Sequence, residues 1–237
     1  MALAVIHRAR LERYFDSDPL RAKKTYEEAA ARYEEVGDRW GLARAVAYLG
    51  WIAEHLGHYA EARQLCERSR AIRQQLGDRR GMADAMVSLG VICWVQGHLD
   101  EAEALVRESM GIFRELDDWN RVAHAIKSLG EVLVRRGQFE DGLAMLESSA
   151  DIYDDLAQDY GLATLRLFLA EAKVHLGRYD EAQDDALRGV ALTRESKHRW
   201  GEGFALLSHG MLALVRGDGS EALAILQGAA AIFTEIK

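Results

Sequence analysis

The sequence has little proline, little cysteine and no long apolar run. It contains 1 proline against 21 glycines in 237 residues, a balance that favours long helices separated by glycine. A membrane-spanning helix needs about 20 consecutive apolar residues, and no stretch approaches that length. The 2 cysteines, Cys66 and Cys93, are too few for a disulfide framework and are typical of a reducing compartment. We therefore expect a cytoplasmic protein that does not enter a membrane.

The chain also lacks an excess of basic charge. The chain carries 30 lysine and arginine side chains against 38 aspartate and glutamate side chains, which gives a net charge of −8. Nucleic-acid binding needs a concentrated basic surface, so no nucleic-acid partner is expected. The amino-terminal segment lacks the basic start and the cleavage site of a secretory signal. The nucleotide-binding pattern Gly-x-x-x-x-Gly-Lys-Ser/Thr is also absent.

Residue types that catalyse reactions or bind metals are present but are not grouped. His55 and His58 are three residues apart, yet Gly57 separates them onto a helix end and the following turn, and no third zinc ligand is implied nearby. Cys66 and Cys93 lie in apolar columns of the pattern described next, so we expect buried structural thiols. These observations predict a non-enzymatic protein without a cofactor or a metal.

Residues of one kind recur every 40 positions along the chain. One column of small residues consists of Ala22, Ala62, Ala102, Gly142, Ala182 and Ala222. Another column consists of Ser17, Gly57, Gly97, Gly137, Gly177 and Gly217. A fixed period of this size indicates a repeat architecture. We predict one all-α domain of six repeats, with approximate bounds 1–38, 39–78, 79–118, 119–158, 159–198 and 199–237.

Each repeat has the pattern of two helices. In the second repeat, Ala45, Leu49 and Ile52 follow one another at the helical steps of three and four residues. The glycine column ends the first helix, since glycine adopts the left-handed conformation of a helix cap. Gly-Asp pairs such as Gly77-Asp78 end the second helix and open the next repeat. The sequence therefore predicts twelve helices and no strand.

The columns resemble the tetratricopeptide motif. Leu49-Gly50 is followed by Ala62 and Ser69 at the motif's spacing of twelve and then seven residues. Repeats of this family usually have roughly 34 residues, whereas these have 40, and Gly-Asp replaces the family's turn proline. The resemblance implies a right-handed α-α superhelix, or solenoid, whose concave groove is lined by the first helix of each repeat.

The run from Leu76 to Gly81 is similar to the 40-residue variant in bacterial signalling ATPases of the STAND class, and related repeats occur in animal cell-polarity adaptors. This resemblance implies a sensor domain whose ATPase lies outside these 237 residues. The chain begins within a first helix and ends where a seventh repeat would start, so we expect a fragment of a larger protein. Since solenoid ends normally need a polar cap, self-association through the last repeat is the alternative.

The resemblance also implies binding positions, because ligands of such proteins usually lie against positions two, five, nine, twelve and thirteen of each first helix. The second and third repeats place Arg44, Trp51, Glu54, His55, Asp84, Val87, Val91 and Trp94 at these positions. The fourth and fifth repeats place His124, Lys127, Glu131, Arg135, Glu171 and His175 there. A surface that mixes aromatic and charged residues is typical of binding hot spots.

Several of these residues have a structural alternative. Trp51 and Trp94 can pack in the core instead of the groove. Lys127, Glu131 and Arg135 favour the groove because burial would make their charges costly, although they can also pair with one another along the helix. In the last repeat, the same positions are apolar and either line the groove or face a following helix: Phe204, Leu207, Met211, Leu214 and Val215.

The fifth repeat departs from the pattern at two positions that face the paired helix. Lys173 replaces the apolar residues Ala53, Cys93 and Leu133 of its column, and Asp185 likewise replaces apolar residues. We predict that Lys173 and Asp185 form an ion pair within this repeat.

We conclude from the sequence that the chain binds a peptide, a protein segment or a small inducer in its groove. A sensor would change its superhelical pitch when a ligand bridges several repeats. A constitutive adaptor, the alternative, would hold its partner without changing shape.

Overall fold

The computed structural model describes residues 19–195 and 199–235, and this part of the chain is helical without a strand. Its helices are α2 (Pro19–Glu35), α3 (Arg39–His55), α4 (Tyr59–Gln75), α5 (Arg79–Val95), α6 (Leu99–Glu115), α7 (Trp119–Arg135), α8 (Phe139–Asp155), α9 (Asp159–His175), α10 (Tyr179–Glu195), α11 (Arg199–Arg216) and α12 (Gly219–Glu235). These eleven follow the predicted order of first and second helices. The predicted first helix of the first repeat lies outside the described residues.

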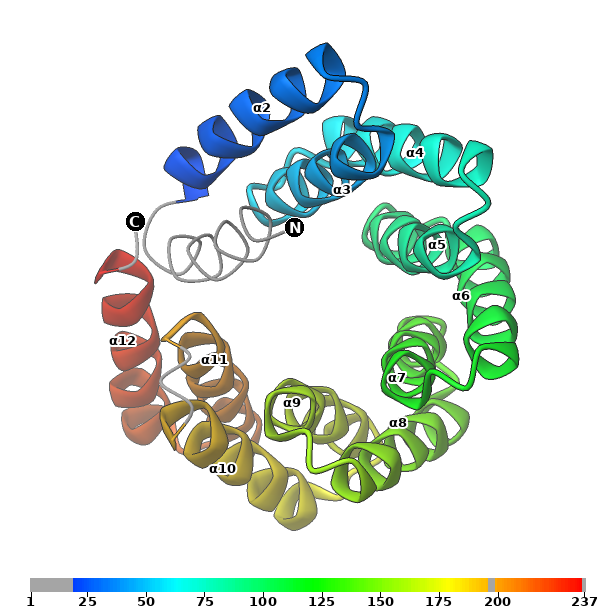
Figure 1. Cartoon of the computed structure of the whole chain (residues 1–237). Helices are drawn as coiled ribbons and strands as arrows, with labels where there is room; N and C mark the ends of the chain where they lie inside the picture. The colour runs from blue at the N-terminus through cyan, green and yellow to red at the C-terminus, as the bar shows by residue number, and fades with distance from the viewer. Residues whose placement is uncertain (1–18, 196–198, 236–237) are drawn as a thin grey trace. The chain divides into compact units, whose positions relative to one another are not determined.

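The chain divides into two compact units, residues 1–118 and 119–237. Within each unit every helix packs against the next one in sequence. In the carboxy-terminal unit α7, α9 and α11 form one layer and α8, α10 and α12 the other (Figure 1). In the amino-terminal unit α3 and α5 lie in one layer and α2, α4 and α6 in the other (Figure 1). We call these the first-helix layer and the second-helix layer.

The helix ends follow the predicted glycine pattern. Gly57, Gly97, Gly137, Gly177 and Gly217 all have positive φ, as do Gly37 and Gly77. Asp38 and Asp78 then cap the next helix, because their carboxylates accept hydrogen bonds from the backbone N–H of Gly41 and Gly81. The Gly-Asp pair thus ends one helix and starts the next within two residues, which explains why the turn does not need proline.

Small residues allow the two helices of a repeat to approach closely. A Cβ atom at Gly90 would lie 2.7 Å from a methyl group of Val106, and one at Gly130 would lie 2.8 Å from Cγ of Leu146. On the facing helices, Ala62 and Ala102 are completely buried. The 40-residue columns of small residues therefore mark the crossing points of paired helices.

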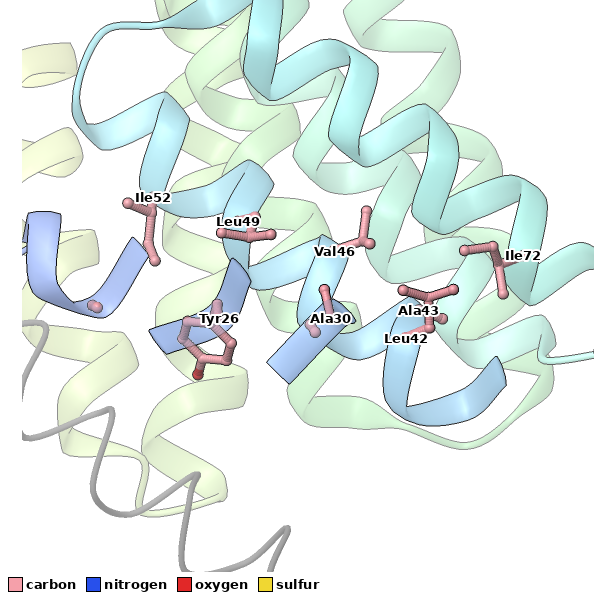
Figure 2. Close-up of a cluster of buried hydrophobic side chains, with 10 residues drawn as sticks. Tyr26, Ala30, Leu42, Ala43, Val46, Leu49, Ile52 and Ile72 are labelled. Atoms are coloured by element: carbon pink, nitrogen blue, oxygen red, sulfur yellow. The ribbon is translucent and has the colours of Figure 1, made fainter. Parts of the chain in front are cut away.

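The core of the first described repeats shows how neighbouring repeats are joined (Figure 2). Tyr26 of α2 stacks on Tyr48 of α3 with ring centroids 4.8 Å apart. The buried cluster around them contains Leu42, Val46, Leu49, Ile52 and Ile72. On α3 these apolar side chains follow one another at the three- and four-residue steps that the sequence shows, so they lie on one face of the helix.

Both cysteines are buried, as the sequence predicts. Burial raises the pKa of the Cys66 thiol to about 12 and that of the Cys93 thiol to about 11. Because a nucleophilic or metal-binding cysteine reacts as the thiolate, these pKa values describe inert packing residues.

Candidate functional site

The first-helix layer of the amino-terminal unit exposes an aromatic residue. Trp51 on α3 is 37% exposed, and its ring lies 4.3 Å from the ring of His55. The Nδ1 atom of His55 lies 2.9 Å from the carbonyl oxygen of Trp51. Burial lowers the pKa of His55, although the contact with this carbonyl raises it. Arg44 is exposed and Glu54 is half-buried on the same helix, so four predicted residues lie on one surface.

The predicted residues of α5 are less accessible. Asp84 is half-buried, and its carboxylate lies 3.8 Å from the Arg73 guanidinium. Val91 and Trp94 are also half-buried, so Trp94 offers a smaller surface than Trp51. Val87 is only 3% exposed and supplies almost no accessible surface.

The first-helix layer of the carboxy-terminal unit has a charged centre. His124 and Arg135 on α7 are exposed, whereas Lys127 is half-buried. The Lys127 ammonium lies 2.8 Å from the carboxylate of Glu131 and 4.9 Å from the centre of the Phe168 ring. Lys127 and Glu131 therefore form an ion pair along the helix, which is the alternative that the sequence left open for them.

Glu131 differs from the sequence expectation, since its side chain is buried with 5% of its surface exposed. The expectation assumed that burial would be too costly for a charge, but Lys127 compensates that charge inside the packed helices. Burial raises the pKa of the nearby Tyr153 hydroxyl, and the negative charge of Glu131 raises it further. Glu131 thus holds Lys127 in place and has almost no surface of its own.

The predicted residues of α9 make contacts with neighbouring helices. The carboxylate of Glu171 lies 2.9 Å from the guanidinium of Arg135 on α7. His175 is exposed, and its ring stacks on Phe139 of α8 with centroids 4.4 Å apart. Arg135 and Glu171 therefore link the two first helices across their accessible face.

The predicted ion pair of the fifth repeat is confirmed. The Lys173 ammonium lies 2.6 Å from the Asp185 carboxylate, which is 3% exposed as a residue. Sequence reasoning missed the third member, Arg166, whose guanidinium lies 2.7 Å from the other oxygen of Asp185. The signal was available, because Arg166 occupies the column of Val46 and Met86. This cluster joins α9 to α10 and is a packing feature.

The first helix of the last repeat exposes an apolar stripe. The side chains at its groove positions are all more than a third exposed: Phe204 39%, Leu207 38%, Met211 53%, Leu214 48% and Val215 52%. The stripe is next to the charged centre, because α9 contacts both α7 and α11. Charged and apolar surfaces thus adjoin on the first-helix layer of this unit.

The described residues contain no group of three His, Cys, Asp or Glu side chains that could hold a metal ion. Among these same residues, no helix is both long and apolar enough to cross a membrane. The first-helix layers expose aromatic rings, a guanidinium, imidazoles and apolar side chains.

Several solved structures are similar to this chain. BtubC from P. vanneervenii has 16% sequence identity and a TM-score of 0.67, with 92% of each chain covered. The Rap conjugation gene regulator of plasmid pLS20, in complex with the Phr* peptide, has 13% identity and a TM-score of 0.74, with 95% of this chain and 72% of that chain covered. NprR in complex with its cognate peptide NprX has 14% identity and a TM-score of 0.69, with 95% and 66% covered. At these identities the similarity shows the fold.

Sequence comparison adds the repeat type. No curated protein sequence matches the chain. One family profile described as tetratricopeptide repeat matches residues 44–115. A second profile with the same description matches residues 128–148 and 163–184. These matches cover repeats in both compact units and indicate no enzymatic family. The chain therefore contains a tetratricopeptide repeat domain, built of consecutive helix-turn-helix repeats.

Proposed function

We propose that this chain is a non-enzymatic binding module that recognises a peptide or an extended protein segment on its first-helix layers. The observation that carries the proposal is the exposed set of aromatic, charged and apolar side chains at equivalent positions of successive first helices. Trp51 is an example of the aromatic side chains, Arg135 of the charged ones and Met211 of the apolar ones. Aromatic and arginine residues contribute most to binding hot spots. The peptide complexes of the structurally similar Rap regulator and NprR support this proposal.

A library of random short peptides, selected on the immobilised chain, tests the proposal. We expect enrichment of peptides that bind the chain in solution, as measured by fluorescence anisotropy. Replacing Trp51 by alanine should weaken the binding of those peptides that contact the amino-terminal unit, because the change removes an exposed indole. The matched control is Trp40→Ala, which removes a 57% exposed tryptophan outside the groove positions. The absence of any enrichment over an unrelated helical protein would contradict the proposal.

We further propose that the module is a sensor, whose ligand shifts the arrangement of its repeats. The support is again the peptide-bound regulators of similar fold. Membership of a STAND-class ATPase rests on the resemblance of the 40-residue repeats alone, and an adjacent ATPase domain in the full gene product would support it. A cytoplasmic location is part of the same proposal.

Small-angle scattering separates the sensor from a constitutive adaptor. A sensor should change its radius of gyration when a selected peptide is added, because repeat interfaces shift at small cost. An adaptor should give the same scattering curve, apart from the added mass, when free and when bound. If the natural ligand is a small inducer and not a peptide, adding that inducer should displace the selected peptides from the chain.

A further inference from the structure

The repeat formed by α11 and α12 leaves open an apolar face that the earlier repeats of the carboxy-terminal unit cover. Leu207 and Leu214 of α11 are 38% and 48% exposed, and Leu223 of α12 is 59% exposed. Ala230 of α12 is exposed as well. We call these four residues the end face.

The repeat pattern identifies what covers two of these positions elsewhere in the unit. The equivalents of Leu214 and Leu223 two repeats earlier are Val134 and Leu143, which are 6% and 4% exposed. Both belong to a buried cluster to which α9, the first helix of the next repeat, contributes Leu165.

The other two positions are covered in the same way. The equivalents of Leu207 and Ala230 one repeat earlier are Leu167 and Val190, which are 7% and 6% exposed. They form a buried cluster with Ala205 of α11, again a first helix of the next repeat. The end face therefore continues an interface that the unit already uses, and an apolar helix is what fits it.

The two helices of the end face also lack charge. Between Glu221 and Glu235 of α12 there is no Lys, Arg, Asp or Glu, and α11 has none between Glu202 and Arg216. A surface helix normally carries polar and charged residues on its outward face, so α12 has the composition of a covered helix. A charged partner group placed here would lose its hydration without gaining a counter-charge.

A second copy of the chain supplies the uncharged apolar surface that these observations require. Its own α11 is a first helix with exposed apolar side chains and can lie where a following first helix would lie. Other surfaces of the unit do not favour a second copy, because α8 carries six acidic side chains, all exposed, and no basic one. Chains with a net charge of −8 repel each other there, whereas two end faces bring no like charges together.

We propose that two copies of the chain associate through their end faces into a dimer with two-fold symmetry. Contact between identical patches gives a closed dimer and no longer assembly. In this dimer α11 and α12 of one copy pack on α11 and α12 of the other. Leu207, Leu214 and Leu223 then lose their exposed surface, which stabilises the dimer by roughly 25 cal/mol per Å² of apolar surface removed from water.

Sedimentation equilibrium over a range of concentrations tests the dimer. We expect a mass that rises from the 26.5 kDa of one chain to twice that value and then stays constant. A single-chain mass at every concentration would overturn the proposal. A mass that keeps rising with concentration would also overturn it, because it indicates head-to-tail contacts between different patches.

A matched pair of lysine variants locates the interface. Leu223→Lys should raise the dissociation constant of the dimer more than about a hundredfold, because it places an ammonium group without a counter-charge in an apolar interface. The control Leu187→Lys makes the same change on α10, where the side chain is 45% exposed, and should leave the dissociation constant unchanged. Equal effects of the two variants would overturn the proposal.

A milder variant and a footprint complete the test. Leu223→Ser introduces no charge and should weaken the dimer by about tenfold through lost apolar burial, and circular dichroism establishes that each variant is folded. Carbene footprinting of the unmodified chain should show that labelling of Leu223 falls as the dimer forms, while labelling of Leu187 does not. A footprint confined to other helices would overturn the proposal. A monomer that still binds the selected peptides would overturn it as well and leave the proposed function standing.

Discussion

Single residues decide which parts of the first-helix layer are accessible. Val87 and Glu131 occupy groove positions of the repeat but are 3% and 5% exposed. A position in a 40-residue pattern identifies the face of the helix, whereas burial depends on the side chains of neighbouring helices. At Glu131 the neighbours include Lys127 and Tyr153. The repeat pattern alone does not contain this information.

The buried cluster of the fifth repeat yields a prediction for stability. Asp185→Leu should destabilise the carboxy-terminal unit by about 3–5 kcal/mol, because it leaves the charges of Lys173 and Arg166 without their partner. The triple change Arg166→Met, Lys173→Ala and Asp185→Leu restores apolar residues found in other repeats. It should be neutral or stabilising by about 1–4 kcal/mol relative to the unmodified chain. Urea unfolding measures both, and a triple variant as unstable as Asp185→Leu would contradict this account.

His55 yields a prediction for pH dependence. Burial lowers its pKa in the folded chain below the usual 6.5, so the unfolded chain binds more protons between these two values. Stability from this residue is complete above pH 6.5, falls as the pH decreases below 6.5, and levels off below the folded pKa. His55→Gln should therefore reduce the loss of stability between neutral and mildly acidic pH, measured by urea unfolding. The exposed His98 is the control, and an equal effect of His98→Gln would argue against the assignment.

At the scale of helices, the sequence predicts much of the architecture. The glycine columns correspond to the positive-φ residues that end helices, and the small-residue columns correspond to helix crossings. Helix ends were predictable because they depend on local backbone conformation. Asp117 and Ala157 show the limit of the pattern, since they adopt positive φ without being glycine. The crossing of α9 and α10 was partly predictable, because Lys173 and Asp185 interrupt apolar columns.

The close helix crossings yield a prediction with an internal control. Gly130→Ala should destabilise the chain by about 1–3 kcal/mol, because the added Cβ would lie 2.8 Å from Leu146 and 3.1 Å from the carbonyl oxygen of Gly142. Gly111→Ala on α6 has no atom within 4 Å of the added Cβ. It should stabilise the chain by roughly 0.5–1 kcal/mol through the better helix propensity of alanine. Thermal unfolding followed by circular dichroism measures both, and effects of the same sign would contradict the assignment of the crossing.

At the scale of the molecule, the proposed function depends on the alternation of first and second helices. In each compact unit this alternation places residues that differ between repeats on the first-helix layer: Trp51 in the amino-terminal unit, and Arg135 and Met211 in the carboxy-terminal unit. Of the residues that recur every 40 positions, the small ones such as Gly90 and Gly130 lie where the two helices of a repeat cross, and the positive-φ glycines such as Gly57 end helices. Architecture and the proposed binding chemistry therefore use different positions of the same repeat, so the side chains of the proposed binding surface can vary without loss of the fold.

Photo-crosslinking tests this account most directly. A selected peptide that carries a benzophenone group at its centre is bound to the chain, irradiated, and the attachment points are mapped by mass spectrometry. We predict attachment to residues of the first helices α3, α5, α7, α9 and α11. Attachment confined to the second helices α4, α6, α8, α10 and α12 would contradict the claim that the first-helix layers are the binding surface.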